Sequence, residues 1–411
     1  MKKFYKLTVF SVALVVAMAG LIPAVAYGNT AKQNIDGIIE YNLQKSFANS
    51  VQEWIDGELT DDAGEGSEWY IIALSNQAGY DFSSYKNALN DYLSKNEIGS
   101  ASSRLKYALT YIAIGDKSNP YIKNVLGNSI GEQGIMSLVF GLHLLNNGCV
   151  CDDFTVNTLV DELLSLQLAD GGWSVMGEYG DVDVTAMTVQ ALAVHYNNPA
   201  VKTSVDNAVD FLSVHQLENG GYSGYGVANP ESTAQVVTAL SSLGIDADSD
   251  ERFIKNGNTV FDGMSTFRLS DGSFCHKEGG NSDSMSTAQV LSASIAYENM
   301  KNGYCPFYIF DDNNMNYHET SIDEFITEPT LNSEINDTVF YNEGTAEITS
   351  TPINYETDIH KTELSGTDDI KTNSAYLKVF FGGTLLISVC VVFMAVRKRK
   401  KSSIYKNNQR S

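Results

Sequence analysis

SLQLADGGWSVMGEYGDVDVTAMTVQA, residues Ser165–Ala191, is the stretch of sequence that decides the fold. Its composition indicates the end of one helix, a glycine turn and the start of a second, more apolar helix. Gln167, Gly171 and Trp173 give the first half the pattern Q-x-x-x-G-x-W. Glycine adopts the left-handed backbone with which many helices end, so the chain can stop and reverse here. The run 181–186, DVDVTA, then begins the next helix with residues typical of helix caps.

The same unit recurs twice further along the chain. The second copy consists of Gln216, Gly220 and Tyr222. The third copy has Gly272 and Phe274, with Arg268 in place of the glutamine. Their aromatic residues follow position 173 at intervals of 49 and 52 residues, as expected of a two-helix repeat. We expect the glutamine amide to cap an outer helix while the aromatic ring packs over the turn, which would join neighbouring repeats.

These motifs resemble those of a known superfamily. Q-x-x-x-G-x-W is similar to the repeat motif of squalene and oxidosqualene cyclases, and DVDVTA resembles their acid motif D-x-D-D-T-A with Val184 in place of the last Asp. The combination resembles the prenyltransferase and terpenoid-cyclase toroids, a superfamily that also includes the intrinsic-factor and transcobalamin type of cobalamin carriers. The resemblance covers about residues 35–305. It implies a fold but no single activity, because the members include enzymes, carriers and binding modules.

The helical pattern of the chain agrees with such a ring. Outer helices are predicted to start near Ile35, Tyr85, Tyr121, Phe154, Val201 and Phe253, and inner helices near Ser67, Ser103, Glu132, Asp183, Ser232 and Ser286. The outer segments have one apolar stripe, whereas the inner ones are rich in small residues suited to burial on all sides. We therefore predict an all-α domain at residues 32–305, an α6/α6 toroid of six inner and six outer helices. An open superhelical array of helical hairpins is the alternative.

The two ends of the chain indicate export and anchoring. Residues 1–26 have a basic start, an apolar middle and an A-x-A site at their end, as in a secretory signal peptide; an uncleaved anchor is the alternative. Residues 376–396 are apolar enough for a transmembrane helix, and the basic tail 397–411 would lie in the cytoplasm. Because L-P-x-T-G is absent, we expect this helix to be retained. The prediction is a single-pass protein of the cell membrane with its toroid outside.

The charge balance narrows the classes of partner. All 50 Asp and Glu residues lie outside the predicted signal peptide and basic tail, whereas only 17 of the 27 Lys and Arg residues do. Such an acidic surface repels nucleic acid, so we exclude DNA and RNA binding. Residues 306–375 are predicted to form an acidic, disordered, low-complexity stalk. A small β-domain is the alternative, because 338–341 and 346–350 have strand character.

A candidate ligand mouth is predicted where the inner helices begin. Its residues are Asp181, Asp183, Glu231, Asp283, Tyr222 and Tyr225. Aligned on Thr185 and the following alanine, Asp183 occupies the position of the acid that protonates the substrate in the cyclases, so Asp183 and Asp181 would be catalytic in an enzyme. Since Val184 interrupts the acid motif, we expect Asp183 to cap an inner helix instead, with a lowered pKa.

The cysteines suggest a disulfide rather than a metal. Cys275 and Cys305 would close a 30-residue loop, which would stabilise an exported protein by about 3–4 kcal/mol, although free thiols remain the alternative. The zinc pattern of the protein prenyltransferases, D-x-C with a distant His, is absent. We expect no metal and no cofactor, with cobalamin as a conceivable bound ligand.

The functional prediction is therefore a membrane-anchored extracellular binding protein without catalysis. Its toroid would bind a small ligand, cobalamin-like or isoprenoid-like, or a surface partner. The first alternative is a class II terpene cyclase-type enzyme acting on an isoprenoid. The second is a structural surface or adhesion protein.

Overall fold

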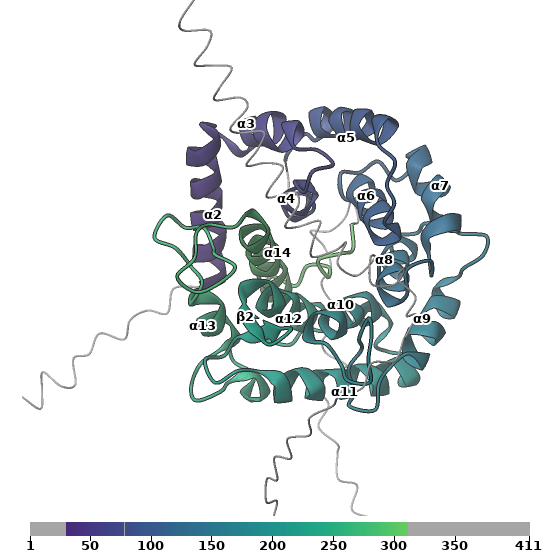
Figure 1. The fold of residues 1–411 in the computed structure, drawn as a ribbon, viewed down its shortest axis with the longest axis vertical. Helices are drawn as coiled ribbons and strands as arrows, with labels where there is room; N and C mark the ends of the chain where they lie inside the picture. The colour runs from purple at the N-terminus through teal and green to yellow at the C-terminus, as the bar shows by residue number, and fades with distance from the viewer. Residues whose placement is uncertain (1–29, 78, 311–411) are drawn as a thin grey trace, which may run out of the picture. The chain divides into compact units, whose positions relative to one another are not determined.

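The computed structural model describes residues 30–77 and 79–310, and this part of the chain is mostly α-helical (Figure 1). The predicted signal peptide, transmembrane helix and basic tail all lie outside the described residues. Among the described helices, none has both the length and the apolar character needed to cross a bilayer.

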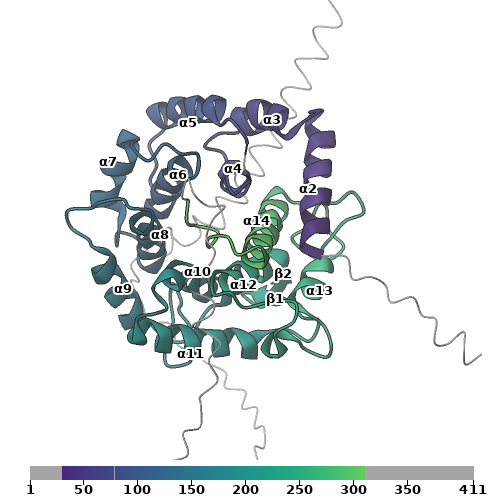
Figure 2. The same cartoon turned by 180° about the vertical axis from the view of Figure 1, so that it is seen from behind.

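Six inner helices surround the middle of the described unit. They are α4 (Glu68–Leu74), α6 (Ala101–Ala113), α8 (Ile135–Asn146), α10 (Val182–Leu192), α12 (Pro230–Ser242) and α14 (Ser284–Lys301). Each contacts the next in this order, and α14 contacts α4, so the inner ring is closed (Figures 1 and 2). Small residues such as Ala234, Ala239 and Ala293 are fully buried, which permits the close packing of α12 against α14.

The outer helices lie around this ring with one face toward it. They are α2 (Thr30–Ser46), α3 (Val51–Trp54) continued by the π-helical turn η1 (Ile55–Leu59), α5 (Ser83–Lys95), α7 (Pro120–Ser129), α9 (Val156–Ser165), α11 (Pro199–His215) and α13 (Val260–Ser265). In α9, for example, Leu159 and Leu163 are buried while Asp161 and Glu162 are exposed. The alternation of inner and outer helices is consistent with an α/α toroid.

The outer layer differs from the prediction in two places. The helix expected near Phe253 is only the 3₁₀ turn η3 (Glu251–Phe253), and the outer helix of that repeat is the later α13. A capping box explains this start: Thr259 accepts from the amide of Asp262 at 3.3 Å, and Asp262 accepts from the amide of Thr259 at 2.8 Å. The short α3 was not predicted. A second 3₁₀ turn, η2 (Ala193–His195), follows α10.

A small hairpin corrects the all-α prediction. Strands β1 (Tyr222–Gly224) and β2 (Val227–Asn229) pair antiparallel in the second repeat. Two residues join them, Tyr225 at φ 50° and Gly226 at φ 77°. Consecutive positive φ angles match the right-handed twist of a tight hairpin, and glycine readily supplies one of them.

Contacts between the two ends of the described chain close the outer layer. Gly272, in the third repeat, has φ 90° and lies so close to the backbone of Gly37 in α2 that a Cβ atom would overlap with it. Arg268 donates to the carbonyl oxygen of Gln33 at 3.1 Å, and the hydroxyls of Tyr41 and Ser282 lie 2.8 Å apart. The third repeat therefore packs on the first outer helix, and both views show α2 beside α14 (Figures 1 and 2).

The segment after α14 also belongs to the folded unit. Residues 306–310, which we assigned to the stalk, bring Phe307, Tyr308 and Phe310 into the core. Asn147 at the end of α8 donates to the carbonyl oxygen of Tyr308 and accepts from the amide of Phe310, both at 2.7 Å. The ring of His143 lies 4.5 Å from that of Tyr308, and burial lowers the pKa of His143 to about 3. The folded part thus extends at least to Phe310.

Candidate functional site: the acidic mouth

In the first two repeat motifs, the glutamine joins its own turn to the next outer segment. The amide of Gln167 donates to the carbonyl oxygens of Gly171 at 2.8 Å and Ser204 at 2.7 Å, and Ser204 lies in α11. The amide of Gln216 makes the same pair of bonds, each 2.8 Å, with Gly220 and Phe253. These hydrogen bonds indicate that both glutamines have a structural role.

The aromatic residue of each repeat is buried, and its backbone is tied to the next inner helix. Trp173, Tyr222 and Phe274 are all 0% exposed. Their backbone amides donate to the hydroxyls of Thr185, Thr233 and Thr287 at 2.8, 3.0 and 3.1 Å. Tyr222 is therefore part of the structural motif. Its side chain is enclosed, and its hydroxyl, like Oδ1 of Asp183, has no hydrogen-bond partner among the described residues.

One residue caps each of the three inner helices that follow these turns. Asp181, Asn229 and Asp283 accept from backbone amides three residues further on, at 3.0, 2.7 and 2.9 Å. The cap of α10 is thus Asp181, which corrects our assignment of that role to Asp183.

Asp183 lies in the first turn of α10, beneath the hairpin. A Cβ atom at Gly224 in β1 would lie only 3.2 Å from Oδ2 of Asp183. Oδ1 of Asp183 is buried and has no hydrogen-bond partner among the described residues. Burial raises the pKa of Asp183 to about 6; the Ser232 hydroxyl opposes this shift, and the charges of Asp181 and Glu231 add to it. The lowered pKa expected from the sequence is therefore wrong.

Glu231, in the first turn of α12, connects the second repeat to the third. Its Oε1 lies 2.9 Å from Nδ1 of His276 and accepts from the hydroxyl of Ser286 at 2.6 Å. Its Oε2 is buried without a partner in the described part of the chain. Sequence analysis did not assign His276 to the mouth, and it named Ser286 only as the start of an inner helix. Their positions in the third repeat could have indicated this role: His276 lies two residues after the motif aromatic Phe274, and Ser286 directly precedes Thr287.

These residues form one cluster, which we call the acidic mouth: Asp181, Asp183, Glu231 and Asp283. Asp283 and Glu231 share contacts with the Ser286 hydroxyl, at 3.1 and 2.6 Å. Tyr225 borders the cluster with 74% of its side chain exposed, and burial together with the charges of Asp181 and Asp183 raises its pKa. The structure thus brings Tyr225 and the four carboxylates of the acidic mouth together.

The cysteine prediction is not supported. Cys275 is a free, buried thiol whose Sγ lies 3.3 Å from the carbonyl oxygen of Phe267, so the disulfide with Cys305 is not formed. Within residues 30–77 and 79–310, no group of three or more His, Cys, Asp or Glu residues is placed to hold a metal ion.

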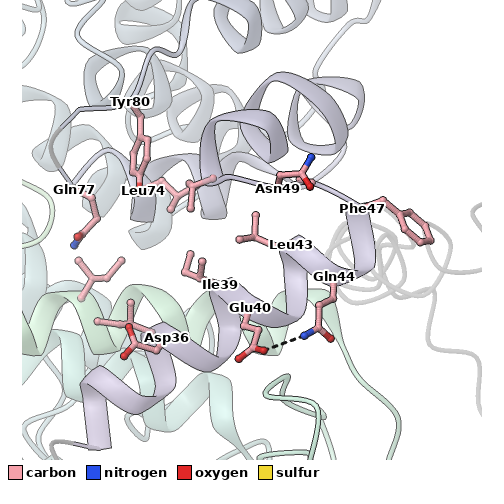
Figure 3. Close-up of a pocket in the computed structure, with 14 residues that line it drawn as sticks. Asp36, Ile39, Glu40, Leu43, Gln44, Phe47, Asn49, Leu74, Gln77 and Tyr80 are labelled. Carbon is pink, nitrogen blue, oxygen red and sulfur yellow. Dashed lines mark hydrogen bonds between the residues drawn. The ribbon is translucent and has the colours of Figure 1, made fainter.

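Two pockets lie away from the acidic mouth. The larger, about 750 Å³, lies between α2, the start of α3, and inner helices α4 and α14 (Figure 3); we call it the α2 groove. The smaller, about 340 Å³, lies between the end of α8, His195 and the segment around Pro306. Neither is lined by a residue of the acidic mouth.

Comparison with solved structures finds terpene cyclases. The type II terpene cyclase MstE from Scytonema, without ligand and in complex with geranylgeranyl dihydroxybenzoate, matches with a TM-score of 0.46 in both cases. The identities are 14% and 13%, and each match covers 66% of this chain and 98% of that chain. ent-Copalyl diphosphate synthase from Streptomyces platensis matches with a TM-score of 0.39 and 17% identity, over 57% of this chain and 49% of that one. No protein-family model and no curated protein matches the sequence.

Proposed function

We propose that this protein is a binding protein whose acidic mouth receives a positively charged group of a ligand or partner and performs no chemistry on it. The observation that carries the proposal is a pair of unsatisfied atoms. Oδ1 of Asp183 and Oε2 of Glu231 are both buried without a hydrogen-bond donor in the described chain. They come from neighbouring inner helices, α10 and α12, in a cluster that also contains Asp181 and Asp283.

Physical chemistry favours a cationic group at such a site. A buried carboxylate without a partner is unstable as an anion, which is the main reason why the pKa of Asp183 is raised. A bound ammonium or guanidinium would donate the missing hydrogen bonds and stabilise both anions. Binding would then lower the pKa of Asp183.

The location of the site would suit an extracellular partner. We propose that the ring is exported and anchored in the cell membrane by the apolar segment 376–396, with the acidic mouth outside the cell. The ligand would then be a small extracellular molecule or a basic side chain of a surface protein. An uncharged isoprenoid would leave both carboxylates unsatisfied, so the mouth favours a cation.

A second candidate, proton donation of the class II cyclase type, is favoured by one observation. A carboxyl with a pKa of about 6 is partly protonated near neutral pH, as a catalytic acid must be. Against it, Val184 occupies the place of the last Asp of the acid motif. In addition, neither of the two pockets described above is lined by Asp183.

Two assays with the full chain separate the candidates. Calorimetric titration with spermidine and with arginine amide should show binding that falls at least about tenfold in a Glu231→Gln variant, because charge-assisted bonds are lost. The matched control is Asp91→Asn, which removes an exposed acid of α5 that pairs with Lys95 at the surface. Incubation with squalene and shorter polyprenyl substrates should yield no cyclised product. Turnover by the natural chain that is abolished in Asp183→Asn while the variant stays folded would establish the cyclase instead.

A further inference from the structure

Each of the three repeats forms a short loop directly before its inner helix. In every repeat the backbone of the motif aromatic pairs with the residue that caps the following helix, and the pairs are Trp173 with Asp181, Tyr222 with Asn229, and Phe274 with Asp283. The loops that these pairs enclose are residues 174–180, 223–228 and 275–282, which we call tip 1, tip 2 and tip 3. Because the starts of α10, α12 and α14 meet at the acidic mouth, the three tips lie beside it.

Tips 1 and 2 contain a concentration of exposed apolar side chains. Five of the ten large hydrophobic residues that are exposed in the described chain lie in these two short loops. Met176 and Tyr179 of tip 1 are 62% and 79% exposed. We call the five residues the apolar rim: Val175, Met176, Tyr179, Tyr225 and Val227. An exposed apolar patch bordered by polar residues marks an interaction site, and Tyr and Met are enriched where proteins bind each other.

The apolar rim adjoins the carboxylates of the acidic mouth. Gly224 of tip 2 lies against the carboxyl group of Asp183, and the charges of Asp181 and Asp183 both act on Tyr225. Asp181 also closes tip 1, through a 2.8 Å bond from its amide to the end of the preceding turn. Within tip 1, Glu178 adds a further exposed carboxylate. Apolar surface and negative charge are therefore combined in one place.

Tip 3 differs from the other two, because it is polar and carries basic residues. Nδ1 of its His276 lies 2.9 Å from Oε1 of Glu231, and the exposed Lys277 follows in the chain. The atoms left without a partner in the described chain are Oε2 of Glu231 and Oδ1 of Asp183. We therefore expect a bound cation between α10 and α12, on the side of tips 1 and 2.

We propose that the acidic mouth and the apolar rim together bind a polypeptide segment of another protein, with an arginine in the mouth and apolar side chains on the rim. This inference rests on the function proposed above and identifies the cation as a protein side chain. A small hydrophilic cation would leave the rim exposed to water. Arginine fits because its planar guanidinium can donate to two carboxylates and stack on an exposed tyrosine. A second copy of this chain, with its net charge of −23, would bring like charges together.

Calorimetric titration of the full chain with synthetic peptides tests the proposal. The probes are acetyl-Gly-Leu-Arg-Leu-Gly-amide, the same peptide with glycine for both leucines, and the same peptide with citrulline for arginine. The leucine peptide should bind at least about tenfold more tightly than the glycine peptide, because its leucines are buried on the rim. Citrulline has the shape of arginine without the charge, so it should reduce the affinity at least about tenfold.

The outcomes separate this inference from the function proposed for the mouth. Equal affinities of the leucine and glycine peptides would overturn the role of the rim and leave cation binding by the mouth intact. Binding of arginine amide without binding of either arginine peptide would do the same. Equal affinities of the arginine and citrulline peptides, or no binding of any cation, would overturn both proposals.

Variants of the rim locate the contact. Met176→Ser combined with Tyr179→Ser should weaken binding of the leucine peptide several-fold and leave the glycine peptide unaffected. Val150→Ser combined with Val214→Ser is the matched control, because both valines are exposed and lie outside the rim. It should leave both affinities unchanged. Equal losses in the two double variants would mean unspecific adsorption to apolar surface and would overturn the proposal.

Photolabelling identifies the surface directly. A leucine analogue that carries a diazirine, placed at either leucine of the peptide, should label residues 175–179 and 225–227, as mapped by mass spectrometry. Label outside the tips would contradict the proposed site. Binding of the full chain to phosphatidylcholine vesicles that is lost in the Met176 and Tyr179 double variant would assign the rim to a membrane surface instead.

Discussion

Burial beneath the hairpin gives Asp183 a pKa of about 6, whereas an exposed helix cap would have a lowered pKa. Gly224 of β1, which sequence analysis could not place, lies against the carboxyl group and contributes to this burial. The repeat motif could be recognised from the sequence because its parts are close along the chain. The covering of Asp183 by a strand about 40 residues away depends on tertiary structure alone.

The raised pKa of Asp183 predicts a pH dependence of stability. Between the ordinary value of 3.8 and about 6 the folded state binds more protons than the unfolded state, so stability falls as pH rises through this window. Asp183→Asn removes this dependence. The variant should therefore gain stability relative to the natural chain between pH 4 and pH 7, by at most about 3 kcal/mol.

Urea unfolding of both proteins at several pH values measures this difference. Asp91→Asn, at an exposed position of α5, serves as the control and should show little change. A constant difference between Asp183→Asn and the natural chain from pH 4 to pH 7 would mean that Asp183 is not buried as described.

The repeat glycines predict a second residue-scale effect. Gly220 has φ 88°, and a Cβ atom there would overlap with the backbone carbonyl of Thr259, whereas Gly226 has φ 77° and open space around it. Gly220→Ala should destabilise by more than about 3 kcal/mol, since strain and overlap combine, and Gly226→Ala by about 1 kcal/mol through strain alone. Chemical unfolding of the two variants distinguishes them. Equal effects would rule out the close approach to Thr259.

Among the helices, the starts that carry Thr-Ala were predicted to within a few residues, because a cap and an apolar run coincide there. α10, α12 and α14 begin at Val182, Pro230 and Ser284, close to the predicted starts. The short elements α3, α13 and the hairpin were missed or misplaced, because helices and strands of three to six residues are too short to show a periodic pattern.

The cap of α10 gives a prediction for this element. Asp181 accepts from the amide of Val184 at 3.0 Å, so Asp181→Ala should lower the free energy of unfolding by about 1 kcal/mol, and Asp181→Asn should be close to neutral. Asp183→Ala removes a buried charge and no capping hydrogen bond. At pH 7 it should therefore raise the free energy of unfolding, or lower it by less than Asp181→Ala does. Thermal unfolding of the three variants measures this. A larger loss of stability in Asp183→Ala than in Asp181→Ala would mean that Asp183, and not Asp181, caps α10.

At the scale of the whole molecule, the ring closes through contacts that no local pattern contains. Arg268 bonds to Gln33 and Gly272 packs on Gly37, across more than two hundred residues. The family resemblance implied a closed ring, whereas the residues alone left an open array as the alternative. The segments that would fix the topology of the chain lie outside the described residues, so that part stays a prediction.

The predicted topology can be tested on intact cells. If residues 27–375 are outside and the tail 397–411 inside, added protease should remove the ring and spare a tag placed after Ser411. Permeabilised cells serve as the control in which the tag is also lost. Loss of the tag from intact cells would place the carboxyl end outside.

The central claim is that the unsatisfied carboxylates of the acidic mouth receive a cation. The most direct measurement is a carbon-13 NMR titration of the Asp carboxyl groups, with the Asp183 signal assigned by its loss in Asp183→Asn. The account predicts a pKa of about 6 in the free protein, falling when spermidine or arginine amide is added, because the bound cation stabilises the anion. A pKa that stays near 6 at saturating concentrations of both cations would contradict it.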